Sequence, residues 1–384
     1  METIYAFETE EHGHLRREVT RWAAREIAPH ARQWEEAGIF PRALYDSAAA
    51  AGLLGVGYPE AVGGGGGDVS HLVVAADAMI VAGQSVGTVA GLGSHAIALP
   101  PILRAGTPEQ QQRFIPPVLR GERIAALAIT EPSGGSDVAS LQTRAVRDGD
   151  HYVVTGAKTF ITSGTRADLF TVAVRTGDPG HGGVSLLVVP ADTPGFSVGR
   201  KLEKMGWWAS DTAEIHFDAC RVPVDNLLGP EGAGFVVIAQ NFAVERVLLA
   251  AQCVAIATLA LQASIDYVRE RRAFGKPLVG FQVLRHKLAD MTTCLAAARA
   301  LTGEVVTRLP RGEDMQLAGL AAMAKNTATD MCSFVCDEAV QLHGGYGYMR
   351  EQLVERLYRD ARLYPIGGGT REIMNEIICK TEGF

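Results

Sequence analysis

The pair of residues best suited to chemistry in this 384-residue chain is Glu245 and Arg246. Adjacent charges of this kind usually lie on the solvated face of a helix. Here, however, the flanking residues are apolar, among them Phe242, Val247 and Leu248. A carboxylate held among apolar side chains has a raised pKa, and it can then act as a general base near neutral pH. The apolar surroundings therefore make a solvated helix face less favoured for this pair.

Two glycine-bearing segments in the middle of the chain have the composition of a ligand-binding surface. The first, residues 127–137, has two glycines followed by Ser136. Such a loop offers backbone N–H groups and hydroxyls at close approach, which suits the polar edge of a ring or a pyrophosphate. The second, residues 156–164, carries the aromatic ring of Phe160 and the hydroxyl of Thr162. A phenyl ring there supplies an apolar stacking surface without a hydrogen-bond donor.

Two segments in the last third of the chain suit a phosphate group. Arg271 lies in the run E-R-R-A-F-G-K-P-L, and its guanidinium offers a fork of charge-assisted donors that fits a pyrophosphate. Gly344 and Gly345 follow His343, and they let a backbone approach a ligand without an intervening Cβ. His343 invites a catalytic role, but its place before a glycine turn favours a packing histidine at a helix end.

Together with residues 204–212 and 222–229, these segments resemble the signatures of the acyl-CoA dehydrogenase family. The resemblance extends over essentially the whole chain and is strongest between Ala128 and Lys380. It implies FAD as cofactor, an electron-transfer flavoprotein as its oxidant, and a homo-oligomer. The family is usually a tetramer, a dimer of dimers, in which the segments around Arg271 and Gly344 hold the flavin of a neighbouring subunit. By resemblance, the cofactor-binding residues are Leu127, Ala128, Ile129, Thr130, Ser136, Phe160, Thr162, Arg271, Phe274, Gln282, Gln341, Gly344, Gly345, Thr370 and Glu372.

The base of the reaction is where this sequence departs from many members of the family. Those members carry a glutamate near the C-terminus, and Gly368 occupies that position here. A second branch, which includes isovaleryl- and long-chain-type members, places its base in a pattern E-R-x-x-x-A, which Glu245 to Ala250 matches. The resemblance therefore implies α,β-dehydrogenation of an acyl-CoA to the trans-2-enoyl-CoA, with Glu245 as the catalytic base and hydride passing to flavin N5. The residues expected to bind the substrate are Ser136, Phe242, Arg246, Gly367, Gly368 and Gly369.

Three alternative functions remain open. The acyl group could be carried by an acyl carrier protein rather than by CoA, as in relatives from secondary metabolism. The same fold could also serve as a flavin oxidase or monooxygenase, or as a scaffold without flavin. Because glycines at 367 and 368 remove side chains from the pocket wall, we expect room for a bulky or branched acyl group.

Two further motif matches are weak. Gly83 to Gly87 matches the nucleophile elbow G-x-S-x-G, which needs a strand before it and a helix after it, whereas helix is expected on both sides. Gly91 to Ala96 matches the dinucleotide pattern G-x-G-x-x-A, but neither the preceding strand nor the acidic ribose ligand is present. We expect close helix packing at both places.

The elements that must position these residues indicate an α+β fold of three domains. Residues 1–122 are expected to form an N-terminal helical domain, with helices ending near Gly38 and Gly52 and a flexible glycine loop at 63–67. Short β-rich runs predict a small antiparallel, barrel-like sheet domain over 123–230. Long Ala- and Leu-rich runs at 233–270, 281–308 and 314–343 predict a C-terminal four-helix-bundle domain over 231–384, with a break at Pro310–Gly312.

Composition and charge exclude several other classes. A formal net charge of −7 gives no reason to expect nucleic acid as a partner, although it leaves room for a local basic pocket that binds a phosphate-bearing ligand. No apolar stretch is expected to cross a bilayer, and the acidic start lacks the pattern of a secretory or transit peptide. The six cysteines have no C-x-x-C spacing, so reduced thiols and no metal site are expected. These features favour a cytoplasmic enzyme.

Overall fold

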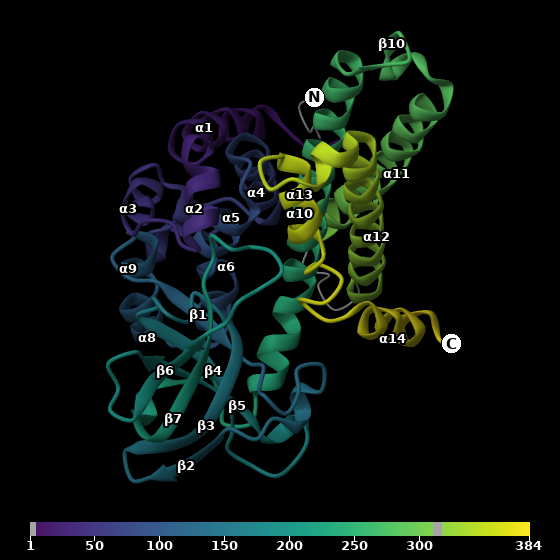
Figure 1. Cartoon of the computed structure of the whole chain (residues 1–384). Helices are drawn as coiled ribbons and strands as arrows, with labels where there is room; N and C mark the ends of the chain where they lie inside the picture. Colours follow the sequence, from purple (N-terminus) through teal and green to yellow (C-terminus); the bar gives the residue numbers. More distant parts are fainter. Residues whose placement is uncertain (1–4, 310–316) are drawn as a thin grey trace.

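The computed structural model describes residues 5–309 and 317–384, and its N-terminal part is built from short helices (Figure 1). The helix predicted to end near Gly38 is interrupted at Pro29, which lies in a 3-10 turn, Ala28–His30. Gly38 then ends the second half with a left-handed φ of 68°. The helices are α1 (Glu10–Glu26), α2 (Ala31–Ala37), α3 (Ala43–Ala50), α4 (Val69–Gly83), α5 (Val86–Leu92), α6 (His95–Ala98), α7 (Pro100–Ala105), α8 (Pro108–Phe114) and α9 (Pro116–Leu119).

The glycine run at 63–67 is more tightly packed than a flexible loop. A Cβ on Gly64 would lie 2.1 Å from the carbonyl oxygen of Tyr58, and Gly65 N–H donates to Gly55 O at 2.8 Å. The run therefore folds back on the turn that precedes it, and glycine is required at position 64 because no side chain fits there.

The middle part is a single eight-stranded sheet with the order β6-β7-β3-β2-β4-β5-β8, and β1 pairs with β4. Most pairs are antiparallel, as predicted, but β1 and β2 both run parallel to β4. The strands are β1 (Ala125–Ala128), β2 (Arg144–Asp148), β3 (His151–Thr162), β4 (Leu169–Arg175), β5 (Val184–Pro190), β6 (Phe196–Lys201), β7 (Thr212–Pro223) and β8 (Leu227–Leu228). The sequence patterns predicted β1, β3, β4, β5 and β7; β2 and β6 are mostly exposed and lack an apolar run.

The C-terminal part is helical and contains the longest helix of the described chain, α10 (Gly234–Glu270). This helix starts against the sheet, where a Cβ on Gly234 would lie 2.7 Å from the backbone of Ser185 in β5. It packs on α4, α11 and α12 and ends at a small hairpin (Figure 1). The remaining elements are β9 (Arg272–Ala273), β10 (Lys276–Pro277), α11 (Gln282–Arg308), α12 (Ala318–His343), α13 (Leu353–Ala361) and α14 (Arg371–Glu382). The break predicted at Pro310–Gly312 lies outside the described residues.

The expectation that no apolar stretch is long enough to cross a bilayer is wrong by length and composition. Helix α10 contains an 18-residue window with a mean hydropathy of 1.8, and the bent pair Val86–Leu92 and His95–Ala105 passes the same criterion when taken together. However, 67% of the α10 window is buried inside the protein. An all-round apolar helix that is covered by other helices is a core helix, and α10 is covered in this way.

Candidate active site

Glu245 and Arg246 lie about three turns into α10, where Arg246 is buried and Glu245 is half-buried. Arg246 is 6% exposed, and its guanidinium stacks on the ring of Phe242 with 5.0 Å between the guanidinium carbon and the ring centroid. Protein atoms surround the Glu245 carboxylate closely enough that burial raises its pKa, although Arg246 and Lys325 oppose the shift. The Nε of Arg246 is buried and has no hydrogen-bond partner among residues 5–309 and 317–384. A carboxylate whose pKa is raised by its surroundings, next to a buried cation, marks a candidate proton-transfer site.

A glycine turn from the C-terminal segment lies directly against this carboxylate. A Cβ on Gly368 would lie 3.5 Å from Glu245 Oε1 and 2.5 Å from Leu249 Cδ1. Gly368 and Gly369 both have left-handed φ values, 65° and 92°. The turn therefore brings its backbone, without side chains, to the position opposite the Glu245 carboxylate. Of the three glycines predicted to bind the substrate, residues 367–369, Gly368 is thus next to Glu245, which the sequence spacing alone could not establish.

The loop that follows β1 is anchored by a buried ion pair. Lys158 in β3 donates to Glu131 Oε1 at 2.8 Å and to the carbonyl of Ile129 at 3.0 Å, and both side chains are at most 5% exposed. Burial lowers the pKa of Lys158 to about 8, although the Glu131 carboxylate acts to raise it. Burial also acts to raise the pKa of Glu131, but Lys158 and backbone donors outweigh it and keep that pKa below its ordinary value. The ion pair therefore fixes the direction of the chain at Thr130.

Thr130 and Phe160 lie close together because the β1 loop joins the end of β3. The N–H of Thr159 donates to the carbonyl of Thr130 at 2.9 Å. Phe160 has a φ of 60°, unusual for an aromatic residue, and its ring is 68% exposed. A strained backbone that presents an apolar ring to open space is a common feature of ligand-binding sites. Thr162 is half-buried in the same strand, and Ser136 is exposed in the loop.

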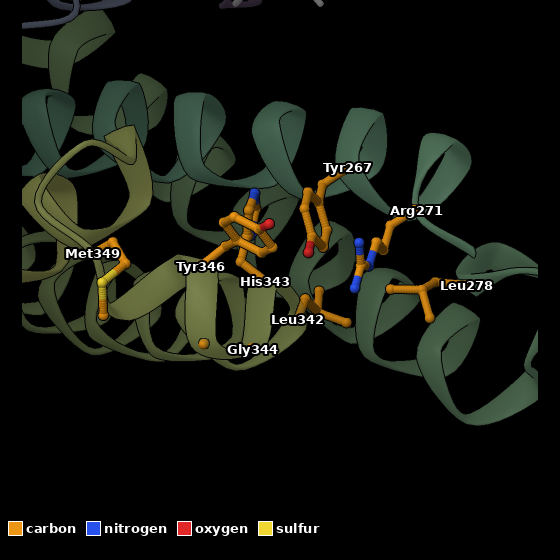
Figure 2. Close-up of a pocket in the computed structure, with 9 residues that line it drawn as sticks. Tyr267, Arg271, Leu278, Leu342, His343, Gly344, Tyr346 and Met349 are labelled. Atoms are coloured by element: carbon orange, nitrogen blue, oxygen red, sulfur yellow. The ribbon is translucent and has the colours of Figure 1, made fainter. Parts of the chain in front are cut away.

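A second site lies at the opposite end of α10, where Arg271 faces the end of α12 (Figure 2). Here a pocket of about 450 Å³ is lined by Tyr267, Arg271, Leu278, Leu342, His343, Gly344, Gly345, Tyr346 and Met349. A Cβ on either glycine would meet nothing within 4 Å, so the backbone there borders open space. His343 is a packing residue as predicted, because its ring stacks on Tyr267 at 4.2 Å and its Nδ1 bonds the carbonyl of Ala339 at 2.7 Å.

The other predicted cofactor residues of the C-terminal part do not line this pocket, and all but the half-buried Thr370 are exposed. Phe274 is 94% exposed at the tip of the β9–β10 hairpin, and Gln282 and Gln341 are exposed at the start of α11 and the end of α12. Thr370 accepts a hydrogen bond from Ile373 N–H as the N-cap of α14, and Glu372 is exposed in the first turn of that helix. The structure therefore brings the predicted residues together in two groups rather than one. Leu127, Ala128, Ile129, Thr130, Ser136, Phe160 and Thr162 lie in the sheet domain, away from the Arg271 pocket.

Sequence reasoning missed several residues of both groups. Lys325 in α12 donates to the carbonyl of Gly369, and Lys158 holds the loop of the sheet domain. Each is a single lysine in an otherwise apolar or β-branched run, a pattern that marks a buried charge needing a partner. Tyr267, which lines the Arg271 pocket, carries no such signal because it lies in an ordinary helical run.

The weak motif matches are packing features. Ser85 is the N-cap of α5 between two helices, and a Cβ on Gly91 would lie 2.7 Å from the ring of Phe40.

Ligand-type atoms of His12, Asp68 and His71 also lie within 4.8 Å of one another at the junction of α1 and α4. The hydroxyl of Ser70 bonds His12 Nε2 at 2.7 Å and also contacts Asp68, so it occupies the centre of that cluster.

Comparison with known proteins decides the family. The N-terminal, middle and C-terminal domain models of acyl-CoA dehydrogenase match residues 9–122, 126–220 and 232–382. The chain belongs to the acyl-CoA dehydrogenase family. An acyl-CoA dehydrogenase of Bacillus subtilis is 39% identical over 97% of this chain and 98% of its own length. The long-chain specific acyl-CoA dehydrogenase of mouse mitochondria is 39% identical over 96% of this chain and 86% of its own.

Solved structures of acyl-CoA dehydrogenases have the same fold. The enzyme of Geobacillus kaustophilus superposes with a TM-score of 0.95, at 40% identity, over 99% of this chain and 100% of its own. The chain is therefore an oxidoreductase of the class that acts on the CH–CH bond of acyl-CoA thioesters. The fold of three parts expected for the acyl-CoA dehydrogenase family is confirmed, with helices before and after a β-sheet domain.

Proposed function

We propose that this acyl-CoA dehydrogenase uses FAD to convert an acyl-CoA to the trans-2-enoyl-CoA, with Glu245 as the base that removes the Cα proton. The observation that carries the proposal is the half-buried Glu245, whose carboxylate lies opposite Gly368, a residue that cannot take a proton. Burial raises the pKa of Glu245, which brings a carboxylate towards the pH at which it is an effective general base.

FAD, when bound, supplies the acceptor for the hydride that leaves Cβ. The chain's own residues perform the other tasks. Glu245 takes the proton from Cα, and the electron pair of that C–H bond becomes the new double bond as the hydride departs. The unpartnered Nε of Arg246 is available to the polar part of the thioester, and the bare backbone of the Gly367–Gly369 turn lies where a carbonyl next to Glu245 would meet it.

The residues of the chain fit a flavin dinucleotide, provided that two copies contribute. Phe160 and Thr130 offer an exposed ring and a backbone edge for the isoalloxazine, while Arg271 and Gly344 offer a cation and an open backbone for the pyrophosphate. Glu245 lies in the continuous helix α10, and Arg271, 26 positions later, is the residue that directly follows this helix. That separation is about 39 Å at 1.5 Å per residue, which is too long for one dinucleotide to contact both ends. A homo-oligomer would bring the two sites together, because the Arg271 pocket of one copy could contact the flavin bound to another. By resemblance, that oligomer is a tetramer.

The thioester carrier and the electron acceptor are part of the same proposal. We favour CoA as the carrier and an electron-transfer flavoprotein as the oxidant. Carrier-protein substrates are the second candidate, because the prolyl acyl carrier protein oxidase, a solved structure, resembles this chain with a TM-score of 0.91 at 30% identity. All six cysteines are free, which supports a reducing, cytoplasmic location.

The test is an anaerobic titration of the flavin-loaded protein with a panel of straight and branched acyl-CoAs, followed by visible absorbance. We expect one class to bleach the wild-type flavin. Glu245→Gln should slow flavin reduction by about 10²- to 10⁴-fold while the protein still binds the substrate, because only the base is lost. Glu231→Gln is the matched control, since that carboxylate accepts from Tyr152 Oη at 2.6 Å in the sheet domain.

Each contrary result has a distinct meaning. Bleaching of Glu245→Gln at the wild-type rate would show that another group is the base. A wild-type flavin that ignores every acyl-CoA but is bleached by an acyl carrier protein would replace the CoA substrate with the carrier-bound one. Rapid oxygen consumption without any other acceptor would identify an oxidase.

A further inference from the structure

Lys325 is a buried lysine whose role the proposed reaction does not use. It lies on α12, is 1% exposed, and donates from Nζ to the carbonyl of Gly369. Burial lowers the pKa of this lysine to about 8, so it remains mostly charged at neutral pH. Burying a cation carries a large desolvation penalty unless its partners offset it, and a single hydrogen bond to a backbone carbonyl offsets little of that penalty.

The place of the Gly369 carbonyl explains what the lysine holds. Gly369 follows Gly368, and a Cβ on Gly368 would point towards Glu245 Oε1 and Leu249 Cδ1. Backbone bonds close the turn at its ends, where Gly367 N–H donates to Leu363 O at 2.9 Å and Arg371 N–H donates to Pro365 O at 3.1 Å, and Lys325 adds a bond at Gly369 between them. The bond from Lys325 therefore fixes the one stretch of backbone that faces the base.

Attachment of the C-terminal helix does not require Lys325. Asn326, the next residue of α12, donates to Asn375 of α14 at 2.9 Å, and Arg371 pairs with Asp330. These contacts already tie α14 to α12. Lys325 instead reaches past the helix start to the turn, so its contact serves the turn and its surroundings.

The charge of Lys325 also acts on Glu245. Among the described residues, the ionisable groups that shift the pKa of Glu245 are Arg246 on the same helix and Lys325 from α12; α4, α7, α11 and α13, which also pack on α10, add none. Cys253 of α10 and Arg246 act in turn on Lys325. Lys325 is therefore the cation that another element directs at the base.

We propose that Lys325 is a positioning residue of the active site, which holds the Gly367–Gly369 turn against the base and keeps a positive charge beside Glu245. The inference rests on the proposed function of Glu245. In this role the charge of Lys325 favours the ionised form of Glu245 before a substrate binds, whereas burial favours the protonated acid. Its removal should shift that balance towards the acid.

The first experiment is an infrared difference titration of the flavin-loaded protein, which requires no turnover. Subtracting the spectrum of Glu245→Gln isolates the carboxyl band of Glu245, and its intensity is followed against pH. In Lys325→Met we expect the protonation midpoint of Glu245 to move to higher pH than in wild type, because an attractive cation has been removed. Lys325→Arg, which keeps the charge, should return the midpoint towards the wild-type value.

Lys204→Met is the matched control for losing a buried lysine. Lys204 in the sheet domain donates to the carbonyl of Ser210 and to Thr212 Oγ1, and burial lowers its pKa to about 8 as well. This variant should lose thermal stability and leave the Glu245 midpoint unchanged. If Lys325→Met does not fold, Lys325→Gln provides the same comparison, because its amide can donate to Gly369 without a charge.

A second readout separates this inference from the proposed reaction. At a pH below the wild-type midpoint, Lys325→Met should reduce flavin roughly tenfold more slowly with acyl-CoA, and the difference should shrink at higher pH. An unchanged Glu245 midpoint in Lys325→Met and in Lys325→Gln would overturn the role of Lys325 whatever the activity. A wild-type flavin that no thioester reduces would refute the proposed reaction, and the infrared midpoints would still decide whether Lys325 acts on Glu245.

Discussion

Replacing Gly368 with alanine tests the idea that the C-terminal turn is shaped around Glu245. The residue has a φ of 65°, and an L-residue pays about 1–2 kcal/mol in this region. Its new Cβ would lie 2.5 Å from Leu249 Cδ1, an overlap of the kind that costs about 1–3 kcal/mol when a packed site is overfilled. The two terms add to about 2–5 kcal/mol, which corresponds to a loss of about 30- to 5,000-fold in kcat/KM if the turn must be in place.

The assay is steady-state turnover with the acyl-CoA that bleaches the flavin, together with the melting temperature. Gly367→Ala is the control for stability, because its φ is not left-handed and its Cβ would meet Leu363 only at 3.7 Å or beyond. The double variant Gly368→Ala/Leu249→Ala relieves the overlap but not the backbone strain, so we expect it to recover about tenfold. Wild-type turnover in Gly368→Ala, or no recovery in the double variant, would refute the steric reasoning.

Two further changes test the buried charges. Lys158→Met leaves Glu131 as an unpaired buried carboxylate, so we expect a loss of about 3–5 kcal/mol in stability, seen as a lower melting temperature and weaker flavin binding; melting at the wild-type temperature would contradict this. Burial, reinforced by Glu35, raises the pKa of Asp360 from 3.8 to about 7. The folded state keeps a proton in that window that the unfolded state has released, so stability falls as pH rises from about 4 to about 7. Asp360→Asn should flatten the dependence of melting temperature on pH across this range, and an unchanged slope would show that Asp360 does not cause it. The exposed pair of Arg221 and Asp148 is the control for both, because its loss should have no measurable effect.

The order of the elements could be predicted because hydrophobic periodicity and glycine punctuation are local signals. Strands β4 and β5 are buried along almost their whole length, and their apolar runs identify them. Strands β2 and β6 face solvent and carry charges, so no periodic pattern reveals them. The break at Pro29 was also missed, since the apolar stripe continues on both sides of it.

The site was predictable where family motifs carry it and not where distant elements meet. Glu245 and Arg271 each lie in a recognisable pattern, so resemblance identified them. The approach of Gly368 to Glu245, and the bond from Lys325 to Gly369, join three segments far apart in the sequence. Such contacts depend on how α10, α12 and the C-terminal turn pack, and no local spacing encodes that packing.

The position of α10 in the chain has a consequence for biosynthesis. The N-terminal helices and the whole sheet leave the ribosome before residue 234, whereas α10 covers apolar surface of both α4 and β5. Until α10 has been made, those two surfaces are open to water and to other nascent chains. Exposed apolar surface of this kind is what makes incomplete folding intermediates aggregate and what chaperones bind. A ribosome stalled shortly before Gly234 would therefore present the most aggregation-prone form of this protein, and the synthesis of a single helix ends that exposure.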